Sequence, residues 1–264
     1  MTSRDNILLT NKINKTTVTI NILKDKILNI TDQIIAFDKI SLPREAERKF
    51  SSLPGELSSV QGDITNLDNV LRIIKDNKIE RIFHGAAVTA GPKRDLEEPE
   101  LILSVNVMGL INSLKASKAA GTVKRIINIS SGSAYGDGGF GDTGWDGVLD
   151  EYETREDPVT LYAISKFASE RITRRLGSLM NLNVCNVRLS AIFGPWEYDT
   201  GLRDTLSAPM QASLLALSSS TAILSRKESR DWTYSRNVAE ALYAIMDKEN
   251  LTHDLYNITS GIPW

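Results

Sequence analysis

Tyr162 and Lys166 have the types and the spacing to move a proton together. They lie four residues apart in the segment LYAISKFASERITRRLGSL, whose apolar residues recur every three or four positions, as in a helix. Residues four apart share a helix face, so the ammonium of Lys166 can reach toward the ring of Tyr162. A nearby cation favours the phenolate and lowers the pKa of the tyrosine, which yields a base for a hydroxyl proton. The same spacing is common in ordinary helices, where it means only a partly buried tyrosine beside a solvated lysine.

Short strands and helices alternate along the chain around this pair. Six β-branched runs are predicted as strands, at residues 6–10, 33–38, 57–63, 81–87, 123–131 and 182–190. Helical patterns lie between them, at residues 67–78, 99–121 and 161–179, and Gly121 is placed to cap the second. Continuous apolar runs indicate strands that are covered on both faces. The sequence therefore predicts an α/β fold with a doubly wound, Rossmann-like parallel sheet.

The pattern changes in residues 191–264. A loop rich in Trp, Asp and Gly is followed by a helical run around residues 210–217 and a short strand, TAILS, at residues 221–225. We interpret this part as a small lobe on the carboxyl edge of the sheet, with the helix NVAEALYAIMD returning to the main body. The chain stops soon after a further strand, without the helix expected to cover it, which predicts a missing carboxyl end.

Composition excludes several classes of protein. With 264 residues, 41% of them hydrophobic, the chain can bury a substantial core. The formal net charge of -2 offers no positive field for a nucleic acid or an anionic membrane, and no apolar run suits a signal peptide or a membrane span. The single Cys185, in an apolar strand, indicates a reducing, cytoplasmic setting. His84 and His253 lack companions at ligand spacing, so no metal site is expected.

Nine short motifs follow one another in the order of a known family. They are a strand-end Asp38 and then GDITN, HGAA, NVMG, SSGSAYG, YAISK, RLSAIFGP, RDWTYS and YNITSG. On these residues the chain resembles the extended short-chain dehydrogenase/reductase family, in its NAD-dependent nucleotide-sugar epimerase/dehydratase branch, over nearly its whole length. The resemblance implies a dinucleotide-binding Rossmann domain at residues 1–190 and a substrate-binding lobe at residues 191–264. It also implies NAD as cofactor, a UDP-sugar as substrate, and a homodimer built from the helices at 99–121 and 161–179.

The resemblance assigns a catalytic trio of Ser131, Tyr162 and Lys166. Ser131 is chosen over Ser130 because the family's catalytic Ser or Thr lies four residues before the Tyr of its Tyr-Gly pair, which is Tyr135 here. Ser131 would hydrogen-bond the same reacting oxygen as Tyr162; the alternative is an ordinary strand-end serine. Tyr162 and Lys166 are also expected to contact the cofactor.

Further cofactor contacts are assigned to residues at strand ends. Asp38 would accept hydrogen bonds from the adenosine ribose and repel a 2'-phosphate, which favours NAD over NADP. The alternative is a turn aspartate that merely ends the strand. Asp63 and Ile64 resemble the pair that borders the adenine, and Ala86 and Ala87 resemble the small residues that let the cofactor pass close to the fourth strand.

Four residues are assigned to the substrate. Ser133 lies beside the trio, Trp196 and Arg203 lie where the lobe should close, and Arg230 resembles an arginine that grips a nucleotide diphosphate. For Arg230 the alternative is a surface ion pair with Asp231.

Gly132 and Ser133 narrow the type of reaction. The sugar dehydratases resembled here carry an Asp-Glu pair directly after their catalytic Thr, so dehydration is disfavoured for this chain. Epimerisation of a nucleotide sugar through a transient keto intermediate is the leading interpretation. The alternatives are a keto-sugar reductase of the same family and a catalytically silent relative with weakened cofactor binding.

The turn after the first strand departs from the family's pattern. The family carries Gly-x-x-Gly-x-x-Gly there, where the backbone approaches the pyrophosphate. Asn11, Asn14 and Thr17 stand at those positions. Asn11 tolerates positive φ, whereas Asn14 would place a side chain at the pyrophosphate and Thr17 would push the helix off the sheet. Asn11 and Asn14 are still the expected cofactor contacts, and three explanations stay open: a diverged working site, a lost site, or a fault in the sequence.

Restoring the three glycines tests this turn. If their loss limits cofactor binding, the combined change Asn11→Gly, Asn14→Gly and Thr17→Gly is expected to strengthen NAD binding by several kcal/mol, because a clash and a displaced helix are relieved. If residues 11–31 form a hairpin or a loop instead, the glycines only loosen the unfolded chain, so the melting temperature falls while the affinity stays unchanged. Calorimetric titration of NAD and thermal melting of the variant distinguish the two.

Overall fold

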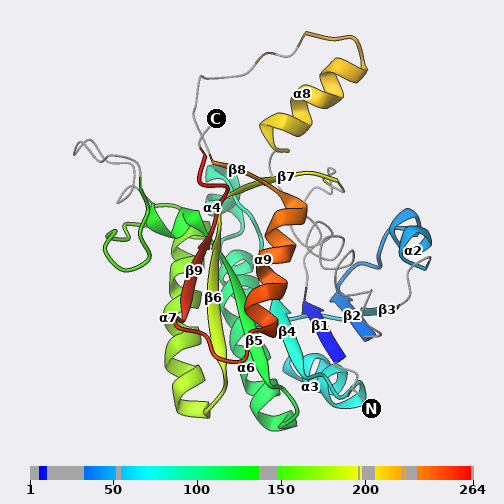
Figure 1. Ribbon diagram of the computed structural model, residues 1–264, viewed down its shortest axis with the longest axis vertical. Helices are drawn as coiled ribbons and strands as arrows, with labels where there is room; N and C mark the ends of the chain where they lie inside the picture. The colour runs from blue at the N-terminus through cyan, green and yellow to red at the C-terminus, as the bar shows by residue number, and fades with distance from the viewer. Residues whose placement is uncertain are drawn as a thin grey trace.

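A parallel sheet of seven strands forms the centre of the computed structural model, which describes residues 6–10, 33–51, 55–136, 148–195, 197, 206–221, 223 and 231–262. The strands follow the order β3-β2-β1-β4-β5-β6-β9, and every neighbouring pair is parallel (Figure 1). Their bounds are β1 (Asn6–Thr10), β2 (Gln33–Asp38), β3 (Glu56–Gln61), β4 (Arg81–His84), β5 (Arg125–Ser131), β6 (Val184–Leu189) and β9 (Leu255–Ile258). The strand order reverses between β1 and β4, which is where doubly wound folds bind their ligands.

Helices cover both faces of this sheet. One hydrophobic core lies beneath α3 (Leu67–Asp76), α5 (Pro99–Leu103), α6 (Gly109–Ala120) and α7 (Leu161–Met180). The other lies beneath α2 (Arg44–Phe50) and α9 (Ser235–Asp247). In Figure 1, α9 accordingly passes in front of the strands, and α6 and α7 lie behind them. Burial from two sides explains why every residue of β5 is buried, and the predicted doubly wound α/β fold is confirmed.

Local signals fix where the helices begin and end. Oδ1 of Asn66 accepts the amide hydrogen of Asn69 at the start of α3, and Oγ1 of Thr160 accepts that of Ala163 at the start of α7, both at 3.1 Å. Gly121 ends α6 with a φ of 73°, so the predicted cap is confirmed. These caps fix where α3 and α7 begin and where α6 ends.

Several predicted elements differ from the structure. The helix predicted at residues 99–121 is interrupted by a π-helical turn, Ser104–Met108, and the strand predicted at 81–87 already ends at His84. The strand predicted at 221–225 is wrong at its described positions, because Thr221 and Ile223 lie outside any strand and a run this short does not specify a strand without a partner. Two short polar helices, α2 and α4 (Pro92–Glu97), show no apolar periodicity from which to predict them.

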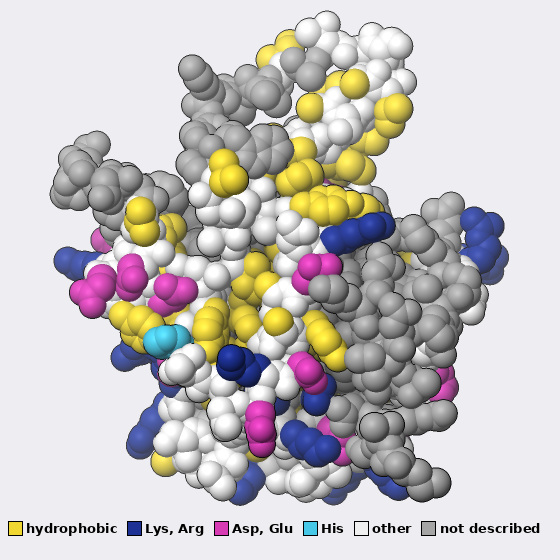
Figure 2. Space-filling view, in the orientation of Figure 1, with side chains coloured by type: hydrophobic (Ala, Val, Ile, Leu, Met, Phe, Trp, Pro, Cys, Tyr) yellow, Lys and Arg dark blue, Asp and Glu magenta, His cyan; other side chains and the backbone are white. Residues whose placement is uncertain are grey.

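A smaller sheet stands beyond β6, formed by β7 (Ala191–Phe193) and β8 (Trp232–Tyr234). Asp231 ties it to the segment after β9, because its carboxylate accepts the amide hydrogens of Ser260 and Gly261, both at 2.9 Å. Farther out, α8 (Ala208–Leu217) has no buried residue, and apolar side chains gather around it at the top of Figure 2. Within the described ranges, no helix has the length and apolar character needed to cross a membrane.

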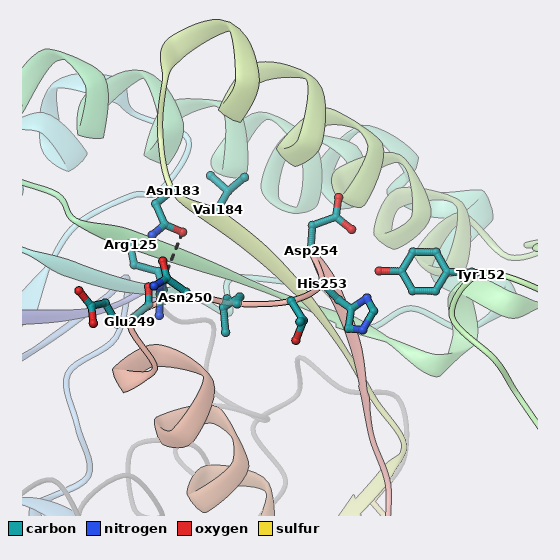
Figure 3. Close-up of a pocket in the computed structure, with 10 residues that line it drawn as sticks. Arg125, Tyr152, Asn183, Val184, Glu249, Asn250, His253 and Asp254 are labelled. Atoms are coloured by element: carbon teal, nitrogen blue, oxygen red, sulfur yellow. Dashed lines mark hydrogen bonds between the residues drawn. The ribbon is translucent and has the colours of Figure 1, made fainter.

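Arg125, the first residue of β5, lies at the amino edge of the main sheet, opposite the carboxyl edge where Ser131 ends the strand. Its guanidinium donates to four carbonyls at the end of α9, among them those of Ile245 and Glu249, both at 2.9 Å. Its Nε also reaches Oδ1 of Asn183 at 3.4 Å. These groups and the loop that follows α9 line an open pocket (Figure 3). Ser131 lies at the other end of β5, about 20 Å away at the usual rise of a strand, so this pocket is separate from the carboxyl edge.

The change Arg125→Met is expected to lower the free energy of unfolding by about 3 kcal/mol, because it leaves helix-end carbonyls without a donor. Lys124→Met is a matched control, since Lys124 is the adjacent residue and its bond to Glu80, at 2.9 Å, is a surface ion pair. The control is expected to stay within about 0.5 kcal/mol of the unmodified chain. Urea unfolding measures both, and equal effects would contradict the capping role of Arg125.

Candidate active site

The proton-transfer pair of α7 lies against the carboxyl half of β5. Tyr162 and Lys166 are only 5% and 4% exposed. Nζ of Lys166 donates to the backbone oxygen of Ile129 at 2.7 Å and lies 5.9 Å from the centroid of the Tyr162 ring. The structure thus brings the two side chains together on one buried face of the helix. The alternative of a solvated lysine is wrong, because the sheet encloses the ammonium.

Two contacts fix the depth of α7 in the fold. At its start, the amide of Leu161 donates to Oδ2 of Asp95 at 3.1 Å. Farther along, a Cβ on Gly177 would lie 2.5 Å from Cγ2 of Val184 in β6, so the absence of a side chain there permits the close approach of helix and sheet. These contacts hold the start of α7, next to Tyr162, against α4 and the later part of α7 against β6.

Ser131 is the last residue of β5 and is buried. Its Oγ accepts the amide hydrogen of Ser133 at 3.2 Å, which caps the short 3-10 turn Gly132–Tyr135. Ser133 itself is exposed. Because α7 packs both on β5 and on this turn, the structure places Ser131 at the same edge as the Tyr162 and Lys166 pair.

His84 ends the neighbouring strand β4 and is buried. Its Nδ1 lies 3.1 Å from Oγ of Ser113 on α6. Burial, and after it the positive charge of Lys166, lowers the pKa of His84 to about 3. The imidazole is therefore neutral at physiological pH. In the sequence, His84 is weighed only as a possible metal ligand. Its place at the end of a buried strand is the signal that could have located it at this edge of the sheet.

Asn106 lies in the π-helical turn and links three parts of the site. Its Oδ1 accepts the amide hydrogen of Val88 at 2.6 Å, and its Nδ2 donates to the backbone oxygen of Val88 at 3.1 Å and to Oγ of Ser165 at 2.8 Å. Ser165 in turn donates to the backbone oxygen of Tyr162 at 2.7 Å. The interrupted helix thus joins the chain after β4 to the turn of α7 that carries the tyrosine; π-helical turns are frequent at functional sites.

Three predicted cofactor contacts meet at the ends of β2 and β3. Asp38, Asp63 and Ile64 line one small pocket. Oδ1 of Asp38 accepts the amide hydrogen of Ile40 at 3.1 Å, so this carboxylate also shapes the turn that ends its strand. Nζ of Lys39 lies 2.6 Å from Oδ2 of Asp63. Burial raises the pKa of Asp63, but the hydrogen bonds from Lys39 and Thr65 outweigh it and hold the pKa below its ordinary value.

Ala86 and Ala87 follow β4, where Ala86 is fully buried. The carboxylate of Asp38 at the end of β2 is an acceptor suited to ribose hydroxyls, and the small side chains of Ala86 and Ala87 leave space beside the end of β4. This arrangement fits the adenosine half of a dinucleotide. The remaining predicted contacts, Asn11, Asn14, Trp196, Arg203 and Arg230, lie outside the described residues. Within the described part of the chain, no group of three or more His, Cys, Asp or Glu residues is placed to hold a metal ion.

Glu170 and Arg188 are buried beside the site, and neither is among the site residues predicted from the sequence. Glu170 follows Lys166 by one further step of four residues, and Arg188 is a charge inside the apolar run LNVCNVRLS. For Arg188 the signal is a charge inside a run predicted to be buried, since such groups are almost never buried unless they are paired. For Glu170 the signal is its place on the helix face that carries Tyr162 and Lys166.

Comparison with known proteins relates this chain to enzymes of sugar nucleotides. A model of the NAD dependent epimerase/dehydratase family matches residues 25–259. UDP-glucuronate 4-epimerase 1 of Arabidopsis thaliana is 29% identical over 153 residues, which are 58% of this chain and 34% of that protein. UDP-glucose 4-epimerase of Mycolicibacterium smegmatis is 25% identical over 223 residues, 83% of this chain and 67% of that protein. The chain therefore spans about a third of the length of the plant relative.

The fold also matches solved structures. The crystallised epimerase of Methanothermobacter thermautotrophicus superimposes with a TM-score of 0.82 at 22% identity, over 99% of this chain and 74% of that one. At this identity the likeness concerns the fold, and it includes the doubly wound sheet described above.

His84 gives a test of the electrostatics at this edge. Because its folded pKa of about 3 lies below the unfolded value, the unfolded chain binds the extra proton first as the pH falls. We therefore expect this group to contribute stability that is complete above pH 6.5 and is lost below it, at about 1.4 kcal/mol per pH unit.

The measurement is urea unfolding at several pH values between 4 and 8. His84→Asn is expected to flatten the slope, because its amide can still meet Ser113 but does not titrate. His253→Asn is the matched control, since His253 is the other histidine of the chain and is exposed. If His84→Asn and His253→Asn show the same slope, the buried neutral state of His84 is wrong.

Proposed function

This chain belongs to the NAD dependent epimerase/dehydratase family, and we propose that it is an NAD-dependent epimerase of nucleotide sugars that acts on a UDP-sugar. The observation that carries the proposal is the buried pairing of Tyr162 with Lys166 beside the strand that ends in Ser131. The two related 4-epimerases support the type of reaction and the UDP-sugar class.

Tyr162 is the proposed base. In its phenolate form it takes the proton of a sugar hydroxyl, and the nearby ammonium of Lys166 stabilises that phenolate. Because the carbonyl of Ile129 holds Nζ in place, the ammonium does not have to reorganise when the proton moves. Ser131 hydrogen-bonds the same oxygen as it changes from hydroxyl to ketone. The proton returns from Tyr162 when the ketone is reduced.

NAD, when bound, would accept the hydride from the carbon whose hydroxyl gives its proton to Tyr162; delivery of that hydride to the opposite face of the ketone carbon, with return of the proton to the oxygen, would invert the carbon. We assign the ribose to Asp38 and the adenine to Asp63 and Ile64. Ala86 and Ala87 allow the cofactor to pass. We assign its reacting end to Tyr162 and Lys166 and its phosphates to Asn11 and Asn14.

The substrate is assigned to the lobe after β6. We propose residues 1–190 as the cofactor domain and residues 191–264 as the substrate lobe. Ser133 is exposed beside Ser131, as a substrate contact requires. Trp196, Arg203 and Arg230 complete the proposed set, with Arg230 on the diphosphate.

Isomerisation is favoured over loss of water. Gly132 and Ser133 follow Ser131 and provide no carboxyl group, so neither can act as the acid or base that elimination of water needs.

We also propose a cytoplasmic location. Cys185 is free and buried, and burial raises the pKa of its thiol to about 12. An inert, unpaired cysteine of this kind is typical of a reducing compartment.

The activity test offers UDP-glucose and UDP-glucuronate with added NAD and follows formation of the 4-epimer. Tyr162→Phe is expected to lower kcat by at least about 100-fold, because the general base is removed. Tyr152→Phe is the matched control, since Tyr152 is an exposed tyrosine at the opposite edge of the sheet and is expected to leave kcat unchanged. Equal activity of Tyr162→Phe and the unmodified chain would refute the assignment.

Two further readouts separate the alternatives. Net consumption of NADH with a keto-sugar, without any epimer, would identify a reductase that uses the same trio. Failure to bind NAD in calorimetry would favour a silent relative, whereas binding at micromolar strength, about -8 kcal/mol, supports an enzyme.

A homodimer is the proposed assembly. Leu103, Met108 and Ile164 are apolar and exposed, and they lie on the two helical segments expected to form the interface. Sedimentation at micromolar concentration is expected to give a dimer. Met108→Glu should weaken it, because a charge is costly to bury unpaired, and Leu96→Glu, an exposed apolar position on α4, should not. A monomeric unmodified chain would contradict the proposal.

A further inference from the structure

A buried ion pair joins α7 to β6 beside the proposed trio. Glu170 is 0% exposed and Arg188 1%. The contact is forked: Nη2 of Arg188 donates to Oε2 of Glu170 at 2.7 Å, and Nε donates to Oε1 at 3.0 Å. The same Nη2 also donates to Oε1 of Glu156 at 2.8 Å. The carboxylate of Glu156 is less buried than that of Glu170. Two planar groups in a fork have a fixed mutual orientation, so the pair defines both a distance and an angle between helix and strand.

The helix side of this pair continues the face that carries the proton-transfer residues. Tyr162, Lys166 and Glu170 follow one another at steps of four along α7. Lys166 binds the carbonyl of Ile129, and Glu170 accepts the hydroxyl hydrogen of Ser130 at 2.5 Å. Two successive residues of β5 are thus held by two successive turns of one helix. The next residue of the strand is Ser131.

The strand side of the pair holds the chain beyond Ser131. Arg188 lies opposite Ser130 in the register of β5 and β6, and its guanidinium lies 4.2 Å from the centroid of the Tyr135 ring. Tyr135 closes the turn that Ser131 opens, and its hydroxyl is bonded to Asn257 of β9 at 3.1 Å. Ser131 therefore lies between two anchored neighbours, and one ion pair contributes to both anchors.

We propose that Glu170 and Arg188 are positioning residues for proton transfer, which set Ser131 against Tyr162 without touching the substrate. The inference rests on the proposed function for its catalytic consequence. A buried ion pair is weak support for stability, because apolar residues of similar volume often stabilise a fold as well or better. What apolar residues do not reproduce is the fixed geometry, and misplacement of a catalytic group by about 1 Å costs on the order of 100-fold in rate.

The test replaces the whole cluster with apolar residues. In the triple variant Ser130→Ala, Glu170→Leu and Arg188→Met, the three fully buried partners are replaced together, and one positive and one negative charge disappear. Glu156 loses its contact with Arg188, but its side chain is 25% exposed and can be solvated by water. We expect a melting temperature close to that of the unmodified chain, a kcat lower by about 100-fold, and little change in KM or in NAD affinity. A folded triple variant with an unchanged kcat would overturn the proposal.

Arg174→Met is the matched control. Arg174 lies four residues beyond Glu170 on the same helix and makes a similar fork to Asp254, at 2.7 and 3.1 Å, but Asp254 lies at the amino end of β9 and not beside Ser131. We expect this control to keep its kcat. If the triple variant does not fold, Ser130→Ala alone removes only the bond to Glu170. It is expected to lower kcat several-fold with KM unchanged, and an unchanged kcat would again overturn the proposal.

A second readout does not depend on turnover. The ultraviolet absorbance of tyrosinate is titrated in the unmodified chain and in the triple variant, each against the same protein carrying Tyr162→Phe, so that the difference reports Tyr162. The two charges that the triple change removes are of opposite sign and in direct contact, so their fields largely cancel at Tyr162, and a shifted midpoint reports altered geometry around Lys166. If the unmodified chain turns over no UDP-sugar, the proposed function fails, but a shifted midpoint still supports positioning and an identical midpoint overturns it.

Discussion

A lysine ammonium that is buried at the end of a strand constrains the whole carboxyl edge of this protein. Removed from water, Lys166 needs an acceptor, and the carbonyl of Ile129 provides one at 2.7 Å. That bond forms only if α7 lies against β5 at one depth and in one rotation, which Gly177 permits by its lack of a side chain. Tyr162, one turn earlier on the helix, is placed by the same requirement. His84 stays neutral nearby, so no second positive charge competes with the ammonium.

The face that α7 turns toward the sheet is polar. Ser165 bonds Asn106 and the tyrosine's own carbonyl, and Glu170 bonds Ser130 and Arg188. An apolar interface tolerates small slides, whereas a buried hydrogen-bond network is satisfied in one register only and is costly in any other. The site thus gains its definition from polar contacts within the core, and the aliphatic cores on both faces of the sheet provide the burial that stabilises the fold.

The two ends of β5 have different tasks. At its amino end, Arg125 satisfies the carbonyls that end α9 and fastens that helix to the sheet. At its carboxyl end, Ser131 opens a turn and faces the edge where parallel sheets bind ligands. Because Arg125 fastens the amino end of β5, the strand is a rigid support for Ser131 at its carboxyl end. A proton-transfer site requires such fixed positions of its groups.

The layers of the fold and the order of most of its elements could be read from the amino-acid sequence. Continuous apolar runs such as that of β5 indicate strands covered on both faces, and steps of four residues placed Tyr162 and Lys166 on one helix face, because both patterns follow from local backbone geometry. Local pattern also located the cap at Gly121. Other features depend on contacts between residues that are distant in the sequence. The π-helical turn at Asn106 depends on Val88 and Ser165, which are distant in sequence, and the strand predicted at 221–225 failed since nothing pairs with its described residues. Charged side chains such as those of Glu170 and Arg188 are not expected inside a core; only their encounter within the fold, where each neutralises the other, makes their burial possible.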